Sequence, residues 1–467
     1  MPNAFAYLAL FGWPVVVVVL YLRKDALSAT FWSIMGGYLL LPQTVAVDLP
    51  LIPPLDKSTI PAVSALLVAR FVRGYRVPLL TDDKAVKWVL LGLLVLPFFT
   101  LIGNGAPIVR EDGSFVPAYT LYDAFTASIK RYLGLLPMVL GAAVVKTNED
   151  LARLCQLFVL AVLAYSLLIL FEVRMSPQLH TWIYGFFPHS FGQQYRFGGF
   201  RAVVFLGHGL LTSILVATGF VLAMTSWRSR SISFPLPWPI VSVYLLLVLI
   251  LAKSLGAILL GMIGGAAVFW LSSGLLWRGV SATALLLLGF PFVKWIGLTP
   301  SDLVVDLLGG YFPQRIESFL FRVRHEDALF AHMMDKPLFG WGTWGRNRLS
   351  DSVTDGQWII TLGMWGFAGY FLTFALPWLA IRRLANRSTA MRPGDTSAHW
   401  LMPLGYALII AVLLVDQIPN ASGNAMFWLL VGIGLGYGQT SKARSPSEPA
   451  PVSASDLRQP TRGVNTS

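Results

Sequence analysis

Long apolar runs, separated by short charged groups, make up most of the chain. A helix needs about 20 apolar residues to cross a bilayer, and about thirteen runs approach that length. They lie near residues 3–22, 26–46, 58–73, 85–104, 122–145, 151–173, 202–224, 238–253, 255–273, 279–297, 357–381, 399–415 and 425–440. The pattern predicts an all-α, polytopic transmembrane helix bundle of about 12–13 spans, forming a single transmembrane domain over residues 1–440.

Basic residues mark one side of this predicted bundle. Arg228 and Arg230 follow the seventh run, and further arginines follow the eleventh. Lysine and arginine are enriched in cytoplasmic loops, so this side is expected to face the cytoplasm. The two long polar segments, residues 174–201 and 298–356, then lie on the outer side. Residues 441–467 are rich in Ser, Pro and Arg, and we expect a disordered cytoplasmic tail there.

Composition narrows the functional classes. Of the 467 residues, 55% are hydrophobic and 12% are charged, whereas a soluble domain carries about 25% charged residues. A soluble enzyme is therefore excluded. The net charge is +12, but the basic residues lie at the ends of apolar runs, which favours anionic lipid over nucleic acid as their partner. Cys155 is the single cysteine, so the chain can form no internal disulfide and no thiolate metal site.

Ionisable residues at the outer end of the seventh run form the first candidate site. Arg196 and Arg201 precede the run, and His208 lies within it. The spacing of Arg201 and His208 predicts that they share one helix face, about 10 Å apart. Arginines in this position can simply extend to lipid phosphate. A histidine inside a span is costly, however, and usually faces a polar cavity.

Three further cations are expected at the outer face. Lys130 and Arg131 lie near the outer end of the fifth run, and Lys253 lies in the turn between the eighth and ninth. Adjacent cations repel each other unless an anion is close. Either a structural partner such as Asp123 or a bound phosphate would serve.

The outer segment 298–356 is predicted to be a large, partly helical loop. Residues 314–334 can form a helix that ends before Pro337, because proline disfavours helix in the residue before it. Arg315 and Arg322 share one face of that helix, and His325 and Glu326 follow. A zinc site on a helix prefers two histidines four residues apart, and His325 and His332 are seven apart, so we expect no metal site.

The end of this loop contains a glycine pattern and a lone carboxylate. Residues 340–345 read Gly-Trp-Gly-Thr-Trp-Gly, which matches the dinucleotide-binding pattern but lacks its strand and parallel sheet. We interpret these glycines as a tight loop against the membrane surface. Asp355 stands just before the eleventh run. It is either a helix N-cap or a carboxylate that acts as a general base.

The order of these features resembles the O-antigen ligase and polysaccharide polymerase superfamily of bacterial inner-membrane glycosyltransferases. An arginine–glycine segment (Arg196 to Arg201) opens a middle span, and a tight turn reads Ala-Lys-Ser-Leu-Gly-Ala at 252–257. A large loop then carries Arg-x3-Ala-x8-Pro-Leu-x-Gly-x-Gly from Arg324 to Gly342. Leu-Gly-x2-Gly-x2-Gly-Tyr follows from Leu362 to Tyr370. The resemblance covers about residues 120–381.

The resemblance implies a bacterial inner-membrane protein with its active site facing the periplasm. Its substrate would be an undecaprenyl-diphosphate-linked glycan, and other polysaccharide-assembly proteins would be further partners. The reaction would invert the sugar and need no metal or other cofactor. Family ligases carry a histidine where this chain has Asp355, and their Ser-Arg-Gly turn is Lys253-Ser254 here. These differences favour a polysaccharide or exopolysaccharide polymerase over a ligase.

The resemblance also implies roles for individual residues. Asp355 would activate the acceptor hydroxyl, with His325 and Glu326 as alternative catalytic residues. His208, Trp341 and Trp358 would contact the glycan. The leaving diphosphate would be bound by Arg196, Arg201, Arg322, Arg315, Lys130, Arg131 and Lys253.

A polysaccharide or lipid-linked oligosaccharide transporter or flippase is the alternative function. A scaffold subunit of an envelope complex is a third. Many spans and charged residues within them suit a transporter as well. Transporters often contain repeated halves and a pair of interrupted spans. We find no repeat of the two halves and no pair of interrupted spans in the sequence, which favours the transferase.

Overall fold

The fold is an all-α helical bundle with three two-stranded hairpins in its described part, seen in a computed structural model. The structure describes residues 1–49, 52–110, 112–196, 198–230, 232–298, 313–350, 352–353, 355–389 and 401–439. Parts of the predicted loop 298–356 and the whole of the predicted tail 441–467 therefore lie outside the described residues. Within them, the main hydrophobic core runs from Ala6 to Tyr437, and a small second cluster is formed by Leu96, Ala127 and Trp365.

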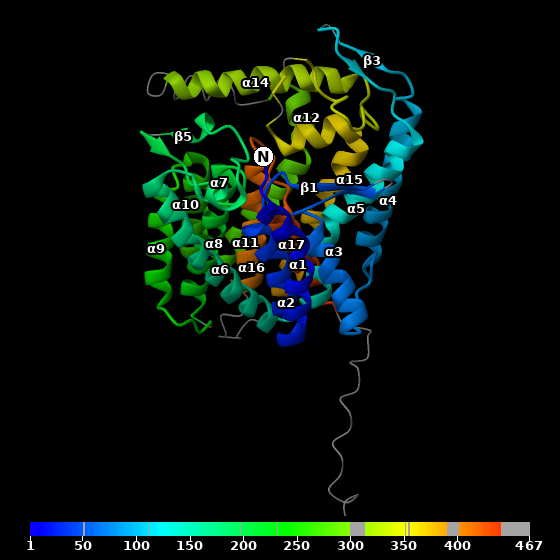
Figure 1. Cartoon of the computed structure of the whole chain (residues 1–467). Coiled ribbons are helices and arrows are strands. Elements are labelled where there is room, and N and C mark those ends of the chain that lie inside the picture. The colour runs from blue at the N-terminus through cyan, green and yellow to red at the C-terminus, as the bar shows by residue number, and fades with distance from the viewer. Residues whose placement is uncertain are drawn as a thin grey trace, which may run out of the picture.

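Thirteen apolar helices run along the bundle in the described part of the chain (Figure 1). Six are long and apolar enough to cross a membrane: α1 (Ala4–Arg23), α4 (Lys84–Ile102), α5 (Leu121–Val144), α6 (Asn148–Met175), α8 (Gly209–Ser229) and α15 (Gln357–Thr389). The shorter ones are α2 (Ala26–Leu40), α3 (Ile60–Leu67) continued by η1 (Val68–Val72), α9 (Trp238–Leu251), α10 (Leu255–Trp270), α11 (Ser273–Leu288), α16 (Leu401–Asp416) and α17 (Ala425–Gly436). These helices suggest a multi-pass membrane protein, and they follow the predicted runs in order.

Three short or amphipathic helices and the hairpins complete the structure. The helices are α7 (Leu179–Tyr184), α12 (Phe290–Trp295) and α14 (Pro313–Met334), with the turn η2 (Gly192–Gln194). The antiparallel hairpins are β1 (Ala46–Leu49) with β2 (Ile52–Asp56), β3 (Ile108–Val109) with β4 (Phe115–Val116), and β5 (Tyr195–Arg196) with β6 (Gly199–Phe200). The helix α14 confirms the prediction for residues 314–334.

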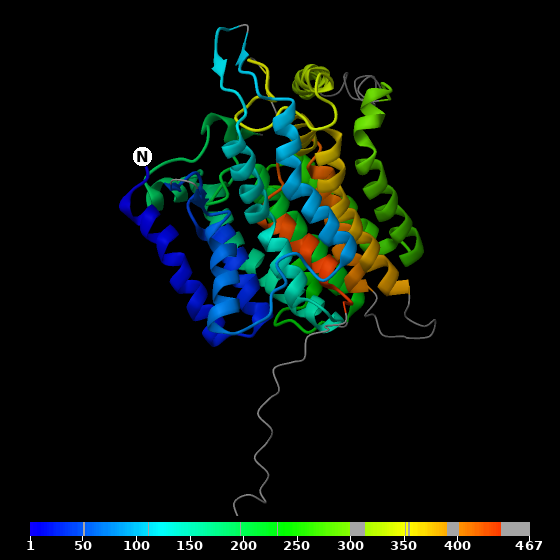
Figure 2. The same ribbon diagram turned by 90° about the vertical axis from the view of Figure 1, so that its right-hand side faces the viewer.

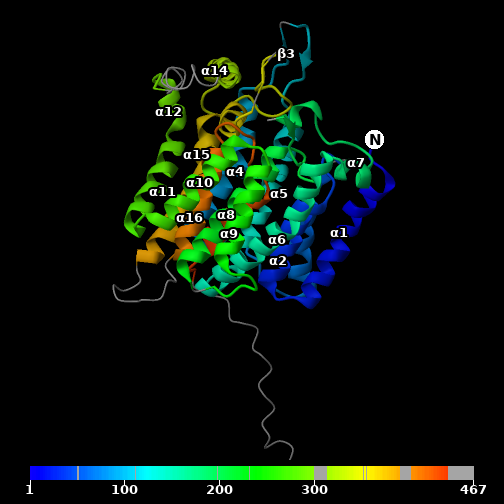
Figure 3. The ribbon, with the colours of Figure 1, turned by 90° about the vertical axis from the view of Figure 1, so that its left-hand side faces the viewer.

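The polar segments gather at one end of the bundle, which we call the loop end. Helix α14 lies across this end, beside the β5 hairpin and below the projecting β3 hairpin (Figures 1 and 3). Turned by 90°, α14 is seen end-on above the long helices (Figure 2). The described members of the predicted basic groups lie at the opposite end, where Arg228 and Arg230 close α8 and Arg382, Arg383 and Arg387 lie in the last turns of α15.

Sequence-encoded caps and small residues fix the helices in place. Thr120 with Asp123 forms a capping box at the start of α5, and Thr147 with Asp150 does the same for α6, so both starts follow from local chemistry. Glycine then allows α5 and α17 to pack closely. A Cβ at Gly432 would collide with the Met138 backbone, as is typical of helix pairs that approach through small residues.

The seventh predicted span is wrong at its outer end. Helix α8 begins at Gly209, not near residue 202, and His208 is its N-cap. The segment 202–208 turns instead, with left-handed φ values of 51° at Val204 and 85° at Gly207. Arg201 and His208 therefore do not share a helix face.

Two buried charged side chains, Glu172 and Lys57, stabilise the non-helical turn at residues 202–208. The Glu172 carboxylate accepts hydrogen bonds from the backbone N–H groups of Val203 and Val204 at 2.7 and 2.8 Å. Lys57 donates to the Phe205 carbonyl oxygen at 2.7 Å. These bonds satisfy backbone groups that a helix would otherwise pair internally, which is why the apolar composition alone misplaces the helix start.

Helix α15 is interrupted. Gly366 has φ 61° and ψ −169° inside it, which breaks the ladder of helical hydrogen bonds. The loop 337–342 fills the break through four backbone hydrogen bonds of 2.7 to 3.1 Å with residues 363–368. One apolar helix, α15, is therefore interrupted, whereas α8 is continuous but starts later than predicted.

Two glycines make this docking possible. A Cβ at Gly340 would lie 2.5 Å from the Met364 carbonyl carbon, and one at Gly366 would collide with Leu338. Both glycines also have positive φ, which other residues adopt at a cost. Within the glycine pattern at 340–345, Gly340 therefore serves close contact with α15, while Gly342 lies against Tyr119 and Thr100.

Candidate functional site

The loop end brings together two predicted site residues that are 33 positions apart in the sequence. Arg322 of α14 and Asp355, just before α15, form an ion pair with 3.4 Å between Nε and Oδ2. Their side chains are 45% and 43% exposed. The pair is therefore open to solvent and easily exchanged for another ion, since exposed pairs contribute about 0–1 kcal/mol.

Asp355 is placed unlike an N-cap. Helix α15 begins at Gln357, so the cap position falls to Gly356. The Gly356 carbonyl oxygen accepts the backbone N–H of Ile360, while the Asp355 carboxylate faces Arg322. The geometry favours the reading of Asp355 as a side chain available for chemistry.

His208 lies beside the same arginines. Its Nδ1 accepts a hydrogen bond from the Leu210 backbone N–H at 3.1 Å, which leaves the proton of the neutral ring on Nε2. Burial lowers the pKa of His208 to about 4, aided by nearby positive charge. These neighbours are His189, Arg201, Arg196 and Arg322. The ring is therefore neutral at pH 7, and arginines from two chain segments, the β5–β6 hairpin and α14, are close enough to act on it.

The β5–β6 hairpin supplies the other cations of this cluster. Arg196 donates to the Tyr195 carbonyl oxygen at 2.7 Å. Arg201 is only 7% exposed, and its Cβ would lie 2.7 Å from a Cβ at Gly209. The Lys253 ammonium lies against Gly199 of the hairpin, so the turn between α9 and α10 reaches the same region. We call Arg196, Arg201, His208, Arg322 and Asp355 the loop-end cluster.

The alternative catalytic residues, His325 and Glu326, lie in a different environment from Asp355. Burial raises the pKa of Glu326, against the opposing effects of Lys294 and the Trp358 indole. The neighbouring Asp327 pairs with Lys294 of α12 at 2.5 Å. His325 packs edge-on against Phe321 with 4.2 Å between ring centres. Arg315 lies near the start of α14, and its side chain is outside the described part.

Neither predicted tryptophan offers an open ring face. Trp358 is 2% exposed and packs edge-on against Phe290 with 4.9 Å between ring centres. Trp341 stacks on His332 at 4.3 Å, and the Lys336 ammonium lies 4.4 Å from its ring centre. Both rings hold the loop in place, so a glycan would need rearrangement to stack on them.

Lys130 and Arg131 lie apart from the loop-end cluster in their contacts. Arg131 donates to the Thr373 hydroxyl at 2.6 Å and lies 4.9 Å from the Trp365 ring centre, while Lys130 is exposed. The alternative partner Asp123 bonds elsewhere, since it accepts the Trp344 indole N–H at 2.8 Å.

Two residues that contribute to the site, His189 and Glu172, were not predicted from the sequence. His189 contacts His208 with 5.1 Å between ring centres, and nothing in the spacing of these residues predicts that contact. Glu172 holds the turn between Arg201 and His208. Its position as an acid near the end of an apolar run is a recognisable signal, because such residues are rarely without a role.

Comparison with known proteins adds no identity. The chain matches no protein-family model and no curated protein. The function must therefore be argued from the loop-end cluster itself.

Proposed function

We propose that the protein is a membrane glycosyltransferase of the O-antigen ligase and polysaccharide polymerase type. It would use an undecaprenyl-diphosphate-linked glycan as donor and polymerise surface polysaccharide or exopolysaccharide repeats. The observation that carries this proposal is the convergence of arginines and one carboxylate at the loop end. Arginines bind phosphate through paired hydrogen bonds, and a carboxylate can receive or orient a hydroxyl proton.

The proposed reaction is a single displacement. The acceptor hydroxyl oxygen attacks the anomeric carbon of the donor sugar, and the bond from that carbon to the diphosphate oxygen breaks. Arg196, Arg201 and Arg322 stabilise the charge on the leaving undecaprenyl diphosphate, which is the electrostatic role that a metal ion plays elsewhere. Asp355 orients the hydroxyl and takes its proton. One displacement inverts the anomeric configuration.

The proposed location of the protein is the bacterial inner membrane, with the loop end facing the periplasm. It rests on the basic residues that follow α8 and α15, since basic loops are cytoplasmic. We expect reporter fusions at residue 330 to report the periplasm and fusions at 230 and 450 to report the cytoplasm. A cytoplasmic signal at 330 would rule out both the orientation and the mechanism.

The decisive experiment concerns Asp355. We expect Asp355→Asn to reduce glycan transfer from purified lipid-linked donor by about 100-fold or more, which is the usual contribution of a general base. The matched control is Asp112→Asn in the exposed β3–β4 hairpin, which should leave transfer unchanged. Full activity of Asp355→Asn at normal membrane levels would remove this residue from the mechanism.

The interrupted helix favours a second candidate, a transporter or flippase for lipid-linked oligosaccharide. Broken helices often carry the substrate site of transporters, and α15 is broken at Gly366 here, while a non-helical turn precedes α8. Proteoliposomes distinguish the two functions. A flippase would move the labelled lipid between leaflets without lengthening its glycan, whereas the proposed polymerase would lengthen the glycan.

A further inference from the structure

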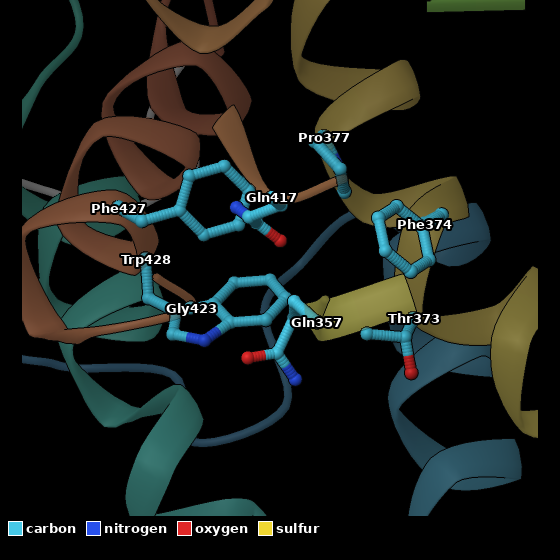
Figure 4. A pocket seen from close by; sticks show the side chains of 8 residues that line it. All are labelled: Gln357, Thr373, Phe374, Pro377, Gln417, Gly423, Phe427 and Trp428. Atoms are coloured by element: carbon cyan, nitrogen blue, oxygen red, sulfur yellow. The ribbon is translucent and has the colours of Figure 1, made fainter. Parts of the chain in front are cut away.

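A small cavity lies inside the bundle, next to the start of α15. It is formed by α15, by the segment that joins α16 to α17, and by the first turn of α17 (Figure 4). Its volume of about 40 Å³ accommodates about three water-sized groups, at 10–15 Å³ for each. The residues that line it are Gln357, Thr373, Phe374, Pro377, Gln417, Gly423, Phe427 and Trp428.

The break at Gly366 creates this cavity. In an uninterrupted helix, Gln357 and Thr373 would be about 24 Å apart, at 1.5 Å per residue. They instead line one cavity (Figure 4), so the first part of α15 turns back toward the second. Because Gln357 follows Asp355 by two residues, its backbone lies within about 7 Å of that of Asp355.

The cavity has a polar mouth and a mixed floor. Gln357, Thr373 and Trp428 are half-buried, whereas Phe374, Phe427 and Gln417 are buried. Gln417 is 3% exposed and points into the cavity (Figure 4). Its amide nitrogen has no hydrogen-bond partner among the described residues. A buried amide without a partner costs about 1–3 kcal/mol, so this group calls for a polar occupant.

The lining selects the chemistry of that occupant. Gln417 offers an amide donor, and the Gln357 carbonyl oxygen, 3.1 Å from a Cβ at Gly423, offers an acceptor at the mouth. The rings of Phe374 and Phe427 add an apolar wall. A hydroxyl group would use only the polar half of this surface. An acetamido group has an N–H, a carbonyl and a methyl group, and its few heavy atoms fit the volume.

We propose that this cavity binds the acetamido group of an N-acetylated sugar in the substrate. The inference rests on the proposed glycosyltransferase function, because it makes the cavity, which is lined by Gln357 two residues after Asp355, a specificity site for the donor or acceptor sugar. The amide–amide pairing sets the sugar ring at the mouth, where Trp428 lies and Asp355 is near.

The test compares two probes on the full-length protein in nanodiscs. They are farnesyl diphospho-N-acetylglucosamine and farnesyl diphospho-glucose, with Kd measured by titration calorimetry. We expect the acetamido probe to bind about 10- to 100-fold more tightly, the scale on which a pocket discriminates between small groups. Equal Kd values would overturn the proposal, as would a cavity that holds only water when the acetamido probe is bound.

Two variants test whether the cavity causes the tighter binding of the acetamido probe. Gly423→Ala adds one methyl group at the mouth and should remove the preference while leaving the glucose probe unaffected. Gln417→Leu should also remove it, with Gln439→Leu, three residues after the end of α17, as the matched control. Retention of the preference in both cavity variants, with normal thermal melting, would place the acetamido group elsewhere.

The same titrations keep this inference separate from the proposed function. Binding of both probes with equal affinity, and its loss in Arg322→Ala, would support the diphosphate site and reject the acetamido pocket. If neither probe binds, the proposed function fails, and the acetamido pocket fails with it.

Discussion

Arg322 and Arg346 are both at the loop end, yet their environments differ sharply. Arg346 is 2% exposed, and its guanidinium donates to the carbonyl oxygens of Pro117 at 2.5 Å and Ala106 at 3.0 Å. Arg322 is 45% exposed and has a 3.4 Å ion pair with Asp355. One arginine is fixed by the backbone of another segment, and the other has a partner that water can replace.

The difference separates a structural arginine from one available to a ligand. Backbone carbonyls cannot move away without unfolding the hairpin that carries them, so the contacts of Arg346 are permanent. The Arg322–Asp355 pair contributes about 0–1 kcal/mol and can exchange its carboxylate for a phosphate. Both are arginines of one polar loop, so the residue type alone does not distinguish them.

The largest expected effect is on transfer activity in Arg322→Ala. Loss of a group that stabilises charge on the leaving diphosphate should lower the rate by about 10²- to 10³-fold. Thermal stability should change little, since the lost pair is exposed. Arg322→Lys should also be impaired, because lysine cannot make the paired contact. Normal turnover in both variants would break the comparison with Arg346.

Arg346→Met should show the opposite behaviour. Its removal takes the donor from the part-buried hydrogen bonds to the carbonyl oxygens of Pro117 and Ala106, which should destabilise the protein by about 1–2 kcal/mol. A thermal melt in detergent would show this as an earlier transition. Any folded fraction should bind the diphosphate probe with unchanged Kd. Weaker binding by that folded fraction would place Arg346 in the site.

The smallest expected effect is a pH dependence that belongs to His208. Its folded-state pKa of about 4 lies below the ordinary value of 6.5, so the unfolded chain binds more protons between these values. Stability should therefore fall as pH drops from 6.5 towards 4, by about 1 kcal/mol per pH unit. His208→Asn keeps an N-cap and should flatten the melting temperature across this range. An unchanged dependence of the melting temperature on pH in His208→Asn would show that groups other than His208 cause the effect.

The fold was largely predictable because its determinants are local. Apolar runs of sufficient length, with caps such as Thr120 and Thr147 at their starts, define most helices to within a few residues. The exceptions depend on distant partners. The start of α8 is set by Glu172 and Lys57, which lie 31 and 148 residues from the groups they bind.

The candidate site was predictable in its residue types and less so in its contacts. Arg322, Asp355, Arg196, Arg201 and His208 are ionisable residues at span ends, where charge is costly unless it is used. Which of them meet depends on the packing of α14 over the bundle, which no short pattern encodes. Trp341 and Trp358 were predicted to contact the glycan, but they pack within the protein. Their residue type could not separate the two roles, because the same aromatic surface that suits a sugar also suits a protein core.

The docking of residues 337–342 into the break of α15 has a consequence for protein engineering. Neither segment is complete alone: the loop needs the freed backbone groups of the helix, and the helix needs the loop to cover them. Exchange of the outer loop between related proteins is a common way to transfer specificity. Here the transferable module must run from α14 through the first turns after Gly366. A graft that ends at Asp355 would include Gly340 but not Gly366, the glycine of α15 against which Gly340 packs.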